Sequence, residues 1–186
     1  MPPIAPFRAM LEFATGGLTP VGGEFSRRLS EMAGAYADTE ATEKLIAECD
    51  DPVVYVGYDA SVPEEQGHLL FRSTIVYPGT VGSEYFMTKG HHHVNDTAEF
   101  YLGMSGEGWM LMESRTGEYA QEMLVPYGAV YVPPGWAHRT VNTGDEPLVF
   151  LAVYPGDAGH DYAAIERAGF SRRVFKTGEG PEFRQA

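Results

Sequence analysis

One short segment of the 186-residue chain concentrates side chains that bind metal ions. His91 and His93 are two residues apart, and side chains two apart in an extended strand share a face. Glu99 opens the next apolar run, and His138 lies in a later one. Three imidazoles and one carboxylate that converge inside a β-structure are typical of a first-row divalent metal site. We therefore predict a metal site formed by His91, His93, Glu99 and His138.

A single histidine would not support this prediction, because a lone histidine in a strand is more often structural than a metal ligand. His68 follows Gly67 in an expected loop, and we assign it no role. His92 lies between the two expected ligands and should point away from them. The prediction depends on the combination of His-X-His, a spaced glutamate and a second histidine segment.

The predicted ligands belong to a region whose pattern indicates β-strands. Residues 53–154 consist of short runs rich in Val, Tyr, Phe and Leu, which Pro- and Gly-containing turns separate. The expected strands are Val53–Tyr58, Leu69–Tyr77, Glu84–Thr88, Glu99–Met104, Gly108–Glu113, Tyr119–Val125, Ala129–Val132, Ala137–Asn142 and Leu148–Tyr154. Many short strands at this spacing are typical of a sandwich or barrel. The sequence shows no alternation of strands and helices, which disfavours a doubly wound sheet.

The flanking regions have a different character. We expect an extended arm over residues 1–25, and a helix over residues 28–48 with Ser30 as a candidate cap. A second helix is expected over Asp161–Ala168, and then a mixed tail, Ser171–Ala186, whose basic residues are solvated. We treat residues 1–186 as one domain, with the arm and helix in 1–50, the barrel core in 51–155, and the C-terminal helix and tail in 156–186.

Composition and charge narrow the partners that the chain can have. The net charge is −13 and the isoelectric point is near 4.8, so nucleic acid and anionic membrane surfaces are repelled. An anionic substrate would need a locally positive site. With Cys49 as its one cysteine, the chain cannot form an intrachain disulfide. The longest apolar run is too short to cross a bilayer and the N-terminus lacks a signal-peptide pattern, so we expect a cytoplasmic protein with no membrane or nucleic-acid partner.

Two motifs in the chain resemble those of the cupin superfamily. The first contains Gly90, His91, His93, Glu99 and Gly106, and the second contains Gly128, Pro133, Gly135, His138 and Asn142. The resemblance implies an all-β fold, a jelly-roll barrel, here with a few flanking helices and the N-terminal arm. Cupins carry out many chemistries, so this likeness alone does not define a function.

Longer segments are similar to the cupin-type phosphoglucose isomerases. They are residues 80–91, 131–142 and 150–162, together with the helical segment around Met32–Tyr36. The similarity extends from about Arg28 to Phe170. It implies a glycolytic or gluconeogenic enzyme that interconverts glucose 6-phosphate and fructose 6-phosphate. It also implies a homodimer and a divalent metal, with Fe²⁺ as the expected ion and Mn, Ni or Zn as alternatives.

This family resemblance also implies roles for individual residues. It gives the metal ligands as His91, His93, Glu99 and His138. The residues that match the family's sugar-phosphate pocket are Tyr55, Thr74, Thr88, Gly90, Tyr101, Tyr154, His160 and Tyr162. Glu99 is the candidate base, and Tyr101 and His160 are candidates to move protons between the substrate oxygens. Gly135 stands where the family commonly has tyrosine, which predicts a gap at the mouth of the pocket.

Several alternatives stay open from the sequence. The isomerisation can proceed by proton transfer or by a metal-assisted hydride shift. The same ligand set fits an iron-dependent cupin oxygenase acting on a small organic substrate, although no thiol or arginine clamp is evident near the motifs. A non-enzymatic cupin that senses a sugar is a third reading, disfavoured because no partner domain is recognised. Lys89 is out of phase with Thr88 and is equally compatible with a surface position.

Overall fold

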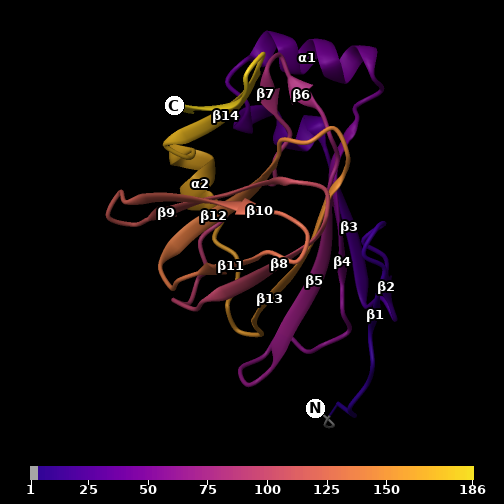
Figure 1. Cartoon of the computed structure of the whole chain (residues 1–186). Helices are drawn as coiled ribbons and strands as arrows, with labels where there is room; N and C mark the ends of the chain where they lie inside the picture. The colour runs from indigo at the N-terminus through magenta and orange to yellow at the C-terminus, as the bar shows by residue number, and fades with distance from the viewer. Residues whose placement is uncertain (1–3) are drawn as a thin grey trace.

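Two antiparallel sheets form the body of the protein, whose computed structural model describes residues 4–186 (Figure 1). The larger sheet has the strand order β11-β8-β13-β5-β4-β3 and the smaller sheet the order β10-β9-β12. The larger sheet contains β3 (Gly23–Arg28), β4 (Val53–Asp59), β5 (Leu69–Val76), β8 (Glu99–Ser105), β11 (Ala129–Val132) and β13 (Leu148–Pro155). The smaller sheet contains β9 (Gly108–Ser114), β10 (Tyr119–Leu124) and β12 (Trp136–Asn142). The predicted all-β jelly roll is confirmed, although the sheets stay separate and do not close into a continuous barrel.

Strand periodicity determines which side chains reach the interior. In β8, Glu99 and Tyr101 are buried while Phe100 between them is exposed. The main apolar core combines residues of both sheets, among them Val54 and Leu148 from one and Met110 from the other. The polar residues Glu99 and His138 are buried on this same interior side. The two sheets therefore surround an interior that contains an apolar core and a polar pocket.

The segment that carries His91 and His93 is less regular than predicted. β7 covers only Glu84–Tyr85, and the chain beyond it meets β12 through two isolated bridges, from Met87 to Val141 and from His91 to His138. Gly90 interrupts the pairing with a positive φ of 76°, and a Cβ there would lie 2.7 Å from the Phe170 ring. The expected strand Glu84–Thr88 is wrong beyond Tyr85, where only an isolated bridge at Met87 remains, and the close approach at Gly90 requires a glycine.

The helix expected over residues 28–48 is two shorter elements. A 3₁₀-helix, η1, covers Leu29–Ala35, and α1 covers Thr39–Glu48. Asp38 begins α1, since its carboxylate accepts a hydrogen bond from the Ala41 amide at 2.9 Å. Ser30 does not cap this helix; its hydroxyl donates to Asp51 at 2.7 Å. An aspartate is a strong N-cap, so helix formation restarts there rather than continuing from η1.

The C-terminal tail is ordered, contrary to the expectation of a solvated mixed segment. After α2 (Ala163–Ala168), the strands β14 (Arg172–Thr177) and β15 (Gly180–Gln185) form a hairpin that joins β7 and β6 (Thr80–Val81) in a third sheet. Arg173 donates to the carboxylate of buried Glu84 at 2.8 Å and to the Ala35 carbonyl at 2.7 Å. Arg173 is therefore not part of a solvated patch, whereas Lys176 is exposed as expected. In Figure 1, α1 and the tail lie together at the end of the molecule where β6 and β7 are labelled.

The N-terminal region contains more strand than the predicted arm. β1 (Met10–Leu11) and β2 (Leu18–Thr19) form a small hairpin, and β3 pairs with β4 at the edge of the larger sheet. Residues 1–3 of the predicted arm lie outside the described residues. Within residues 4–186, no helix is long and apolar enough to span a membrane. The division of the chain into 1–50, 51–155 and 156–186 within one domain stays a prediction.

Candidate active site

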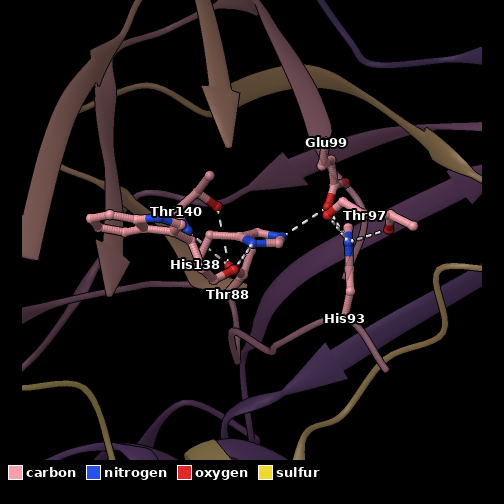
Figure 2. A network of polar contacts seen from close by, with 7 residues as sticks. Thr88, His93, Thr97, Glu99, His138 and Thr140 are labelled. Atoms are coloured by element: carbon pink, nitrogen blue, oxygen red, sulfur yellow. Dashed lines mark hydrogen bonds and ion pairs between the residues drawn. The ribbon is translucent and has the colours of Figure 1, made fainter. Parts of the chain in front are cut away.

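Four side chains from separate parts of the chain meet in the interior. His91 and His93 come from the irregular segment, Glu99 begins β8 and His138 lies on β12. One ligand atom of each lies within 4.8 Å of those of the others, and we call these four residues the metal cluster. Figure 2 shows the Glu99 carboxylate between two imidazoles; its Oε2 lies 3.0 Å from His93 Nε2 and 2.8 Å from His138 Nε2.

The hydrogen bonds around the metal cluster fit a bound divalent cation. His93 Nδ1 lies 2.9 Å from the carbonyl oxygen of Thr97, and His138 Nδ1 lies 3.3 Å from that of Trp136. These contacts fix the ring orientations, with Nδ1 of each ring toward a backbone carbonyl and Nε2 toward the Glu99 carboxylate at the centre of the cluster. His91 Nε2 is buried without a hydrogen-bond partner among residues 4–186. A buried unpaired nitrogen is costly, and a metal ion is the partner that this arrangement suits.

Two members of the metal cluster, Glu99 and His91, are held in the protonation states that bind metal, while the Glu99 carboxylate raises the pKa of His93. Burial alone would raise the pKa of Glu99, but the charge and hydrogen bonds of His138 and His93 hold it well below its usual value. Burial, with the neighbouring His138 as a second cause, lowers the pKa of His91. A carboxylate that stays ionised and an imidazole that stays neutral are the forms in which these groups coordinate a cation.

The metal cluster adjoins a small cleft of about 60 Å³ that is open to solvent. All the residues assigned to substrate by the family resemblance line this cleft: Tyr55, Thr74, Thr88, Gly90, Tyr101, Tyr154, His160 and Tyr162. Four of them are the inward residues of β4, β5, β8 and β13, and the others lie on the segments before β8 and after β13. Strand alternation and two loops therefore bring the predicted set together, while their individual roles stay predictions.

Thr88 has one unused hydrogen-bonding capacity in this cleft. Its Oγ1 accepts from the Thr140 amide at 3.0 Å and from the Thr140 hydroxyl at 3.2 Å (Figure 2). A hydroxyl group has two acceptor positions and one donor hydrogen. Because both acceptor positions are occupied, the remaining hydrogen of Thr88 is available for an acceptor such as a phosphate oxygen.

His160 and its neighbours form an aromatic wall beside the metal cluster. The ring centroid of His160 lies 4.5 Å from that of His91 and 5.5 Å from that of Tyr154, and the ring stacks on Tyr162. Burial first, and then the nearby Arg72 cation, lower the pKa of His160 to about 4. Burial and the adjacent Glu99 carboxylate raise the pKa of Tyr101 well above its usual value. At neutral pH, His160 is thus neutral, with one donor and one acceptor nitrogen, and Tyr101 is a donor.

The cleft also contains cationic residues that the sequence motifs did not indicate. Arg72 and Arg139 line it, which corrects the expectation that no arginine lies near the motifs. Arg72 is two residues before Thr74 in β5, so the period of the strand could have placed both on one face. Lys89, whose orientation was left open, lines the cleft and forms an ion pair with Glu166.

The gap that Gly135 predicts at the mouth of the pocket stays a prediction. Among residues 4–186, a Cβ at Gly135 would have only Asp96 Oδ1 near it, at 4.0 Å, so the space beside this residue is open. Its φ is +80°, a conformation that glycine adopts without strain, and it precedes β12 directly. The glycine therefore serves the turn that leads to His138.

Comparison with known proteins gives one family over most of the chain. The family model described as Glucose-6-phosphate isomerase (GPI) matches residues 26–185. A glucose-6-phosphate isomerase of Thermococcus gammatolerans is 49% identical over 174 residues, which cover 93% of this chain and 90% of that protein. Its counterpart from Thermococcus litoralis is 49% identical over 170 residues, covering 91% and 88%. That of Sinorhizobium medicae is 40% identical over 177 residues, covering 94% and 83%.

A looser similarity to solved structures was also found. A structure of oxalate decarboxylase from Bacillus subtilis matches with a TM-score of 0.47 and 26% sequence identity. The match covers 55% of this chain and 26% of that chain.

Proposed function

The chain belongs to the glucose-6-phosphate isomerase family, and from this premise we propose that it interconverts glucose 6-phosphate and fructose 6-phosphate in the cleft beside the metal cluster. The observation that supports the proposal is that the metal cluster and the residues suited to bind a sugar phosphate lie in one cleft. Three residues of the metal cluster, His91, Glu99 and His138, line a cleft whose walls also carry hydroxyl, imidazole and guanidinium groups. This combination suits a substrate with adjacent oxygens at one end and a phosphate at the other.

The metal cluster would hold a divalent cation, and we propose Fe²⁺, with Mn²⁺, Ni²⁺ or Zn²⁺ able to replace it. Such a cation supplies Lewis-acid polarisation of the substrate's carbonyl and hydroxyl oxygens. Three imidazole nitrogens and one carboxylate oxygen are donors that all of these ions accept, so the metal supply of the cell contributes to the choice.

We assign the substrate's phosphate to the side of the cleft that carries Thr74, Thr88 and Gly90. Thr88 has a free hydroxyl hydrogen, because Thr140 fills its acceptor positions. Gly90 has no side chain, so its backbone can be approached closely. Tyr55 lines the cleft beside this side, and Tyr154 and Tyr162 contribute hydroxyl groups toward the sugar.

Glu99 is the proposed base for the proton route. In that route its carboxylate removes the proton from C2 of the aldose and returns it to C1 of the ketose, while Tyr101 and His160 exchange protons with the two substrate oxygens. In the alternative route, the hydrogen moves from C2 to C1 with its electron pair, and Glu99 only holds the cation.

Isomerisation in D₂O separates the two routes. Deuterium at C1 or C2 of the product supports Glu99 as a base, and full retention of protium over many turnovers contradicts it.

The isomerase proposal is tested with the purified protein loaded with each metal in turn. Formation of glucose 6-phosphate from fructose 6-phosphate is followed by a coupled assay, before and after treatment with a chelator. We expect turnover that disappears on chelation and returns with Fe²⁺. Oxygen consumption without isomerisation would instead identify an oxygenase, and tight sugar binding without turnover would identify a sugar-sensing protein.

We also propose that the protein is a cytoplasmic homodimer. The outer face of the larger sheet presents exposed aromatic residues, and two of them, Phe100 and Tyr131, are direct cross-strand neighbours. Exposed apolar residues that adjoin one another are typical of protein interfaces. Sedimentation analysis should give twice the chain mass of 20.4 kDa, and Tyr131→Glu should shift it toward the single chain. A wild-type protein that sediments as a monomer would contradict the proposal.

A further inference from the structure

A phosphorylated substrate needs a cation in this cleft, because the whole chain carries a net charge of −13. Three cationic residues line the cleft: Arg72, Lys89 and Arg139. Lys89 is engaged, since its Nζ lies 2.5 Å from Glu166 Oε1. Arg139 is buried, and its two Nη atoms donate to the Met87 sulfur at 3.1 Å and to the Lys89 carbonyl at 2.7 Å. Both groups thus already have partners within the protein, although the buried Nε of Arg139 has none among residues 4–186.

Arg72 differs from the other two in what its guanidinium contacts. Its Nε donates to Asp59 Oδ1 at 2.6 Å, and within residues 4–186 Asp59 is its one side-chain hydrogen-bonding partner. The guanidinium carbon lies 4.7 Å from the ring centroid of Phe25 and 6.0 Å from that of Tyr154. One ion pair and two aromatic rings thus hold Arg72, while both of its Nη groups keep their donor hydrogens unused.

The backbone of β3, β4 and β5 is arranged to support this side chain. Asp59 and Arg72 are register partners across β4 and β5, so the ion pair follows from the strand pairing. Phe25 reaches the cleft across Gly57, where a Cβ would lie only 2.3 Å from a carbon of the Phe25 ring. A glycine in the middle of a strand is otherwise unfavourable, and here it makes room for the ring beneath Arg72.

We infer that Arg72 is a specificity-determining residue that binds the phosphate group of the substrate, with Asp59 and Phe25 as its positioning residues. This inference rests on the proposed isomerase function. The planar guanidinium forms paired hydrogen bonds with phosphate oxygens, and these are stronger than bonds between neutral groups. Asp59 occupies Nε and so leaves the two Nη groups for another acceptor. Arg72 shares a strand face with Thr74, which places the cation beside the hydroxyl groups already assigned to the phosphate.

The test compares mannitol and mannitol 6-phosphate, two unreactive probes that differ only in the phosphate. Their dissociation constants are measured by calorimetry or by competition with the metal-loaded wild-type protein and with Arg72→Met. We expect Arg72→Met to weaken the binding of mannitol 6-phosphate by about tenfold or more, as for the loss of a charged hydrogen bond. The affinity for mannitol should stay unchanged. The KM for fructose 6-phosphate should rise by a similar factor while kcat changes little.

Arg27→Met is the matched control, since it removes the same charge from the same region. The Arg27 guanidinium also lies against the Phe25 ring, at 5.3 Å, but Arg27 does not line the cleft. We expect this variant to bind both probes like the wild type. Arg72→Lys keeps the charge and guards against a misfolded Arg72→Met; it should lose less affinity for mannitol 6-phosphate than the methionine variant does.

Three results would overturn the inference. The first is an equal loss of affinity for mannitol and for mannitol 6-phosphate in Arg72→Met, which indicates a structural role. The second is that Arg27→Met loses as much affinity for mannitol 6-phosphate as Arg72→Met does, which indicates a general effect of charge. The third is unchanged binding of mannitol 6-phosphate in folded Arg72→Met. Absence of turnover in the wild type would contradict the isomerase proposal alone, because both probes are measured without turnover.

Discussion

Two parts of the cleft, the metal cluster and the wall around Arg72, are constructed in different ways. At the metal cluster, Glu99 and His138 are 3% and 2% exposed, and further polar contacts orient two of the three imidazoles. At the wall around Arg72, the side chains of Arg72 and Asp59 are 20% and 32% exposed, and a single ion pair with two ring contacts positions the cation. One part is buried and fixed by several contacts per residue, and the other is partly solvated and fixed by few.

This difference corresponds to what each part must do. Groups that act on reacting atoms must be held within fractions of an ångström, because small displacements reduce the rate strongly. A group that holds a phosphate several bonds away from the reaction tolerates more movement and still contributes affinity. Changes at the metal cluster should therefore reduce kcat, and changes at the wall around Arg72 should mainly raise KM.

The largest effect is expected for His138→Ala, which removes a ligand of the metal cluster. We expect metal content and activity to be lost together, with activity reduced more than about 100-fold, beyond the usual effect of changing a group that only supports a ligand. Metal analysis and the coupled assay on the folded variant measure both. His68→Ala is the control, since this histidine lies outside the cleft. Unchanged metal content in His138→Ala would refute the ligand assignment.

A smaller effect is expected for Thr97→Val, which acts on the metal cluster through His93. The Thr97 carbonyl and hydroxyl oxygens both lie 2.9 Å from His93 Nδ1, and valine removes only the hydroxyl. We expect metal affinity to fall about tenfold, at the lower end for such supporting groups. The dissociation constant is measured with a competing chelator, and Thr116→Val, at an exposed hairpin, is the control. Unchanged metal affinity in the folded Thr97→Val variant would contradict this role.

The two parts also differ in how far the sequence could predict them. The sequence predicts the metal cluster because His91 and His93 are close together, and because imidazole and carboxylate groups at this spacing have few roles other than metal binding. Arg72 was missed because its partners come from other strands, and an isolated arginine in a strand has no distinctive pattern. Its position two residues before Thr74 was the available signal, and it becomes informative only once the strand register is known.

The fold shows the same division between local and long-range information. The nine strands expected in residues 53–154 were nearly all placed within two residues, because alternation and turn residues are local signals. The errors fall where tertiary contacts decide the structure. The hairpin β14–β15 depends on Arg173 reaching Glu84 far away in the sequence, and the bend at Gly90 depends on Phe170.

Thr88→Ala tests the proposed phosphate-binding side of the cleft, and we expect a several-fold rise in KM. The variant loses the hydroxyl hydrogen that Thr140 leaves free, so KM for fructose 6-phosphate should rise about fivefold, more than kcat falls. Steady-state kinetics measure both constants, and Thr80→Ala, whose hydroxyl bonds to Gly82 outside the cleft, is the control. An equal loss of affinity for mannitol, which has no phosphate, would remove the phosphate role from Thr88.

The smallest effect is expected for Gly57→Ala, which reaches the substrate only through two intermediate residues. The new methyl group would overlap the Phe25 ring, so the ring must move and Arg72 loses one of its supports. Asp59 still holds Nε, so we expect KM to rise only about threefold, with kcat unchanged. Gly23→Ala is the matched control on the neighbouring strand, because its Cβ would meet Asp59 at an ordinary 3.7 Å. If Gly57→Ala reduced kcat as strongly as it raised KM, the wall around Arg72 would be as tightly coupled to the chemistry as the metal cluster, and the contrast between the two parts would not hold.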